Sequence, residues 1–106
     1  MTSPLSYEIV SVKRAQGANP HEYLSLGVRF ESGIEVQVFA TDRPEPQAIP
    51  LGWLRTTVDG WTITTMEAND RAERYCMRFV RDNAQAFRDF AVAIIEDEAA
   101  NAPIVK

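Results

Sequence analysis

The sequence predicts an α+β domain in which a five-stranded antiparallel sheet carries one long C-terminal helix on one face. Apolar residues alternate with polar ones through the first two-thirds of the chain, turn sequences interrupt the alternation, and helical periodicity fills the rest. The length of 106 residues, with 45% apolar and 25% charged residues, suits one soluble domain with its own core. We expect the sheet within residues 1–66, the helix within 67–100 and a tail at 101–106.

The first predicted strand, Leu5 to Lys13, changes the face of its apolar residues midway. Leu5, Tyr7 and Ile9 share one parity, whereas Val10 and Val12 share the other. This pattern indicates either a strand that is apolar on both faces or a β-bulge in the middle. Residues 15–22 contain Gly, Asn and Pro and are predicted to form a loop.

The clearest hairpin joins two alternating segments, residues 23–30 and 34–40. A three-residue loop, Glu31-Ser32-Gly33, sets Phe30 opposite Ile34, with the apolar residues of both strands on one face. It also sets Arg29 opposite Glu35. Gly33 then occupies the position of such loops that needs a positive φ.

A second hairpin is predicted around Asp59-Gly60, after a connection from Thr41 to Pro50 whose three prolines exclude a central strand. Consecutive pairing of all five strands gives a meander, which strong twisting could curl into a half-barrel. The hairpin residues expected to face inward are Leu54, Val58, Trp61 and Ile63, and those expected to face outward are Arg55, Thr57, Thr62 and Thr64.

The helix is predicted to begin between Met66 and Arg71, where two capping-box spacings occur, and to end by Asn101, before Pro103. Asn83 lies at the centre of its apolar stripe, so we expect a buried amide bonded to a strand end or loop, or to a second copy of the helix. The stripe consists of Ala72, Cys76, Phe79, Val80, Phe87, Phe90, Ala91 and Ile94.

The opposite side of the helix carries five arginines: Arg71, Arg74, Arg78, Arg81 and Arg88. One interpretation is a basic ridge for an acidic partner. The other is a solvated face with ion pairs at i,i+4 spacing, for which the candidates are Glu67–Arg71, Asp70–Arg74 and Arg78–Asp82.

The outer face of the sheet is the second candidate surface. In the expected registers it receives Tyr23, Phe39 and Trp53, together with Arg55 and one or both of Val10 and Val12. A group of apolar residues on one sheet face indicates that something covers them. A partner, most simply a second copy, is one candidate, and the proline-rich loop of the same chain is the other.

Residues with the chemistry of catalysis are scarce. Cys76 is the one cysteine and lies on the apolar stripe, and His21 is the one histidine and lies beside Pro20. They offer no disulfide, too few ligands for structural zinc and no positioned nucleophile, and the glycines form no phosphate-binding loop. We therefore expect no catalytic residue, metal or cofactor.

Charge and hydropathy limit the partners and the location. The net charge of −4 argues against nucleic acid, whose binding domains carry excess Lys and Arg. No apolar run is long enough for a membrane span, and the start of the chain lacks the pattern of a secretion signal. A cytoplasmic location is expected.

Two functions remain open from the sequence. The first is a non-enzymatic adaptor or inhibitor that binds another protein and forms a homodimer through the outer sheet face. The arginines Arg71, Arg74, Arg78 and Arg81 provide a second surface for such a partner. The alternative is a small-molecule binder or enzyme whose pocket, between sheet and helix, would be lined by Tyr7, Trp61, Tyr75 and Asn83.

Overall fold

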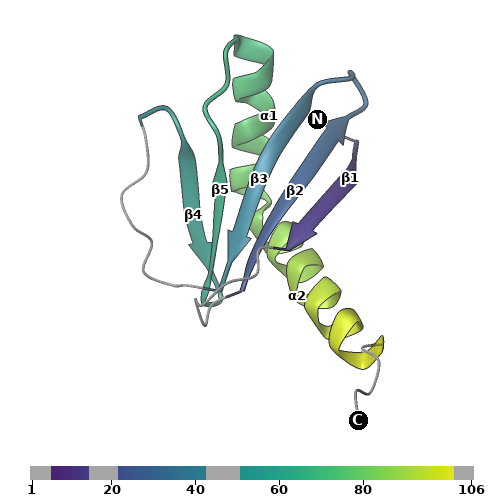
Figure 1. The fold of residues 1–106 in the computed structure, drawn as a ribbon. Helices are drawn as coiled ribbons and strands as arrows, with labels where there is room; N and C mark the ends of the chain where they lie inside the picture. Colours follow the sequence, from purple (N-terminus) through teal and green to yellow (C-terminus); the bar gives the residue numbers. More distant parts are fainter. Residues whose placement is uncertain (1–5, 15–21, 43–50, 102–106) are drawn as a thin grey trace.

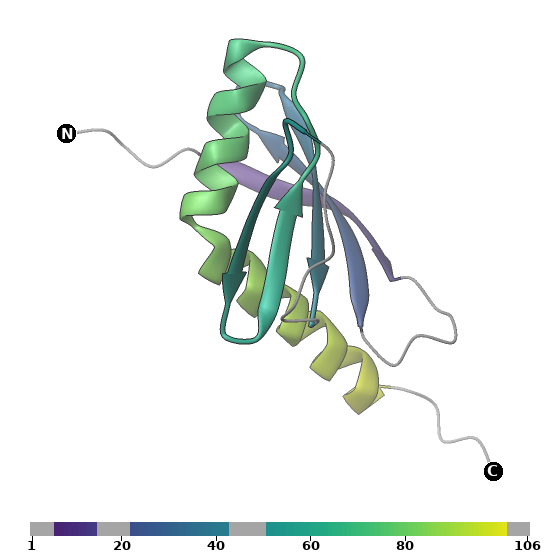
Figure 2. The same ribbon diagram turned by 90° about the vertical axis from the view of Figure 1, so that its left-hand side faces the viewer.

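An open five-stranded antiparallel sheet is covered on one face by two helices (Figures 1 and 2). The computed structural model describes residues 6–14, 22–42 and 51–101, with the backbone alone for 98–101. The α+β class and the five antiparallel strands are confirmed. The elements are β1 (Tyr7–Arg14), β2 (Tyr23–Phe30), β3 (Glu35–Thr41), β4 (Leu54–Val58), β5 (Trp61–Thr65), α1 (Arg71–Asp82) and α2 (Ala84–Asn101).

The strand order is β1-β2-β3-β5-β4, so the predicted meander is wrong in its last two strands. Strand β5 pairs antiparallel with both β3 and β4, and β4 therefore runs in the same direction as β3. Two strands that run in the same direction cannot form the antiparallel pair of a meander. The long connection between Thr41 and Leu54 allows β4 to take the outer position, where it forms one edge of the sheet.

Both hairpins have the predicted registers. Phe30 and Ile34 flank the first turn, where the Phe30 N–H donates to the Ile34 carbonyl at 2.8 Å, and Gly33 has a φ of +93°. Arg29 lies opposite Glu35 and forms an exposed ion pair with it at 3.5 Å. In the second hairpin Val58 pairs with Trp61. The turn residues therefore predicted the pairing within each hairpin correctly.

The bulge predicted in β1 lies between Ile9 and Ser11, opposite Gly27 of β2. A Cβ at position 27 would collide with the Ser11 hydroxyl, so the observed conformation of the Ser11 side chain requires a glycine there. Val12 lies opposite Leu26, and its side chain is therefore on the helix side of the sheet. The expectation was that one or both of Val10 and Val12 lie on the outer face, and this register excludes Val12.

The helical region is broken at Asn83 into α1 and α2, so the prediction of a single long helix was imprecise. Asp70 caps the start as expected, because its carboxylate accepts the Glu73 N–H at 2.8 Å. Asn83 is exposed rather than buried. Its side-chain amide donates to the Phe79 carbonyl at 2.8 Å, a local bond that competes with helix continuation.

The core lies between the sheet and the helices. Leu24, Leu26, Val28, Val38 and Phe87 have no solvent exposure. Of the predicted core, Phe79, Phe90 and Ile94 are only partly buried against the other core residues. Thr62, predicted to face solvent, is on the outer face by register but is buried.

Candidate functional site

Three aromatic rings form a row on the outer face of the sheet, the face without helices. Phe39 pairs with Ser25 and Thr64, and its neighbours Val38 and Ala40 point into the core, so alternation directs its ring outward. The ring centroid of Phe39 lies 5.8 Å from that of Tyr23 and 6.0 Å from that of Trp53, and the planes of Phe39 and Trp53 differ by 9°. We call Tyr23, Phe39 and Trp53 the aromatic row.

The aromatic row is partly open to solvent. Tyr23 is 39% exposed, and Phe39 and Trp53 are half-buried. Partial burial raises the pKa of the Tyr23 hydroxyl, which stays protonated and able to donate a hydrogen bond at neutral pH. Stacked rings with a polar group at one end are typical of residues that dominate protein interfaces. Arg55 lies on the same face, opposite Thr64.

The arginines of α1 are exposed, and the ion pairs expected at i,i+4 spacing are absent from the residues that the structure describes. The absence of each ion pair has a local cause. Glu67 precedes the helix, Asp70 is engaged as the N-cap, and Asp82 pairs with Arg81 at 3.1 Å. Arg71, Arg74 and Arg78 consequently make no ion pair within the described parts of the chain.

Arg74 and Arg78 line a hollow of about 220 Å³ between α1 and the edge strand β4. We call this hollow the β4 groove; Figure 2 views the molecule from the β4 side. Its other lining residues include Gly52, Leu54, Glu67 and Met77. None of these four residues was predicted to line a site, because the strand order that brings Leu54 to an edge beside α1 was not predicted.

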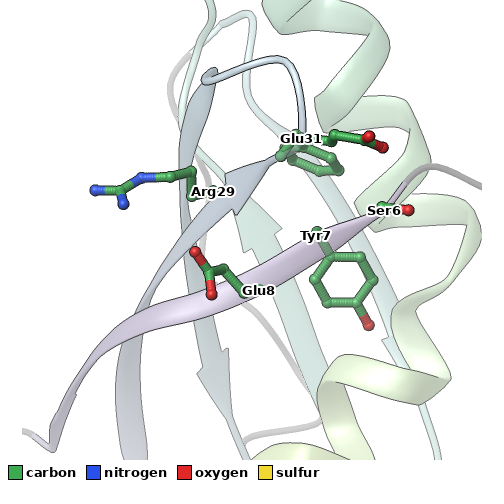
Figure 3. A pocket seen from close by; sticks show the side chains of 6 residues that line it. Ser6, Tyr7, Glu8, Arg29 and Glu31 are labelled. Atoms are coloured by element: carbon green, nitrogen blue, oxygen red, sulfur yellow. The ribbon is translucent and has the colours of Figure 1, made fainter.

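A second hollow, of about 240 Å³, lies at the start of β1 beside the first hairpin (Figure 3). Its polar side chains diverge. Arg29 and Glu8 extend to one side of the strands, whereas Tyr7 and Glu31 extend to the other. Groups that point apart cannot act together on one substrate atom, so this hollow has no catalytic arrangement.

The residues expected to line a pocket between sheet and helix have different surroundings. Trp61 is buried in the core, Tyr75 is 55% exposed on α1, and Asn83 is at the helix break. The ring of Tyr7 stacks on Phe87 with centroids 5.1 Å apart. The two hollows described above lie at the rim of the sheet.

Cys76 is buried, and burial together with the nearby carboxylates of Glu73 and Asp70 raises the pKa of its thiol. A raised pKa disfavours the nucleophilic thiolate. His21 lies outside the described residues. Over residues 6–14, 22–42 and 51–97, no cluster of His, Cys, Asp or Glu side chains could hold a metal ion.

Neither α1 nor α2 is long and apolar enough, over the residues described, to cross a membrane. Comparisons with protein families, with curated protein sequences and with solved structures find no match to this chain.

Proposed function

We propose that the chain is a small non-enzymatic protein-interaction module, an adaptor or inhibitor of the cytoplasm, that binds another protein and self-associates through the outer sheet face. The observation that carries the proposal is the aromatic row of Tyr23, Phe39 and Trp53 on the face opposite the helices. Burying each ring at an interface contributes on the order of 2 kcal/mol.

Two further observations support the proposal over a small-molecule site. The interface between sheet and helices is filled, since Leu26, Val38 and Phe87 are fully buried within it. In addition, the one thiol is buried and disfavoured as a thiolate. Among the described residues, the aromatic row therefore supports protein binding better than any other feature supports a small-molecule site.

The test is the oligomeric state of the variant Phe39→Asp/Trp53→Asp, measured by light scattering coupled to gel filtration. We expect the wild type to be a dimer at high micromolar concentration and the variant to be a folded monomer. Tyr75→Asp is the matched control, because Tyr75 is an exposed aromatic on α1, away from the outer face. It should leave the dimer intact.

Binding to other proteins is tested with the same variants. Affinity capture from the host, followed by mass spectrometry, should identify proteins retained by wild type and Tyr75→Asp but lost with Phe39→Asp/Trp53→Asp. A monomeric wild type whose variant retains the same proteins would show that the outer face is not an interface.

A further inference from the structure

The β4 groove combines a sheet edge with two arginines, Arg74 and Arg78, that make no ion pair within the described residues. Strand β4 forms the edge of the sheet, and no other described strand pairs with it on the side away from β5. On the helix side, Arg74 and Arg78 line the groove together with Leu54 of β4. Trp53 and Arg55, both half-buried on the outer face, adjoin the same edge, so the two predicted surfaces meet here.

The register shows where β4 presents its backbone. Val58 and Trp61 flank a two-residue turn and form a hydrogen-bonded pair, and hydrogen-bonded pairs alternate along an antiparallel ladder. The N–H of Thr57 therefore points away from β5, toward the open edge. An extended peptide can add to such an edge as a further strand.

The spacing of the arginines matches that of a strand. Arg74 and Arg78 are one helical turn apart, which is a rise of about 6 Å, and alternate residues of a strand are about 6.7 Å apart. Figure 1 shows α1 running along β4 and β5. Two acidic side chains at positions i and i+2 of an added strand could therefore each meet one guanidinium.

We propose that the β4 groove binds an extended acidic segment of a partner protein, which adds to β4 as a sixth strand and places alternate carboxylates on Arg74 and Arg78. The inference rests on the proposed function, because it names the kind of protein segment bound. A peptide is favoured over nucleic acid, since the edge requires a partner backbone with N–H and C=O groups and the groove also contains the apolar side chains of Leu54 and Met77.

The experiment titrates the protein into a fluorescein-labelled nonapeptide of alternating glutamate and valine and follows fluorescence anisotropy. We expect saturable binding that weakens severalfold when the salt rises from about 50 mM to about 500 mM, because ions screen exposed charges. The variant Arg74→Gln/Arg78→Gln should lose about tenfold or more in affinity. Arg81→Gln, on the same helix but already paired with Asp82, should change affinity by less than about twofold.

The addition of the peptide to β4 as a strand is tested separately. Thr57→Pro removes the outward N–H and should abolish binding, whereas Thr57→Ala should retain it. A peptide of glutamate and N-methylvaline keeps the charge but loses the strand hydrogen bonds, so it should fail to bind even if Thr57→Pro does not fold.

Several results would overturn the inference. They are equal binding of a lysine–valine peptide or of the N-methylated peptide, an equal loss in Arg81→Gln, tighter binding of single-stranded DNA, and no binding at all. None of these results alters the oligomeric state of Phe39→Asp/Trp53→Asp, so failure here is distinguishable from failure of the proposed function.

Discussion

Replacement of Phe87 by alanine tests the packing of the helices on the sheet. Phe87 lies in the first turns of α2, has no solvent exposure and stacks on Tyr7 of β1. Truncation removes a fully buried ring and leaves a cavity, at a cost of about 3–5 kcal/mol including the aromatic contact. A domain of this size has a free energy of unfolding of about 5–15 kcal/mol, so the variant should be close to unfolding.

The measurement is urea unfolding, followed by far-UV circular dichroism and by the fluorescence of Trp61 and Trp53. The midpoint should fall strongly with little change in slope. Tyr75→Ala is the matched control, because its side chain is 55% exposed, and it should change stability by less than about 0.5 kcal/mol. A loss below about 1 kcal/mol in Phe87→Ala would refute the packing of α2 described above.

The remaining predictions concern the first hairpin and the Arg14–Glu22 pair. Gly33→Val should destabilise the domain by about 1 kcal/mol or more through its positive φ alone, because nothing lies within 4 Å of a Cβ there, and Ser32→Val should not. Hydrogen bonds of 2.8 and 2.6 Å from Arg14 hold the pKa of Glu22 below its usual value of 4.5. The resulting stabilisation, about 0.5–1 kcal/mol, is present above the unfolded-state pKa and is lost as the pH falls through the lower folded-state pKa. Glu22→Gln should therefore be less stable than wild type at pH 7, with a gap that closes on acidification in urea unfolding; a gap independent of pH would contradict the pairing.

The parts of the fold predicted correctly are those that depend on neighbouring residues. Asp59-Gly60 and Gly33 specify turns, and the Asp70–Glu73 spacing specifies a helix start, independently of tertiary contacts with the rest of the chain. The order of β4 and β5 is different. Alternation places the same side chains on the same faces in either order, so periodicity carries no information about which strand of the hairpin pairs with β3.

The helix break was missed because Asn83 interrupts the helix without glycine or proline. Apolar residues recur at helical spacing on both sides of it, so the periodicity seemed continuous. The signal was the polar side chain at the centre of the stripe, which bonds the Phe79 carbonyl instead of entering the core.

The candidate site was predicted in part. The alternation of side chains along each strand was sufficient to predict that Tyr23, Phe39 and Trp53 share one face, because the register of β2 and β3 was predicted correctly. The β4 groove depends on strand order, which places Leu54 beside Arg74 and Arg78. Ion pairs along α1 were overestimated, since Asp70 was expected both to cap the helix and to pair with Arg74, and its carboxylate is engaged as the cap.

The recess at Gly27 has a consequence for how the sheet can come apart. Strand β1 pairs with β2 along its length, Tyr7 stacks on Phe87, and Ser11 lies over Gly27. A methyl group at position 27 would collide with the Ser11 hydroxyl and disturb the β1–β2 pairing at that point, while the pairs among β2, β3, β5 and β4 do not depend on this contact. Because β1 is an edge strand, its release would uncover the β2 edge as a template for aggregation.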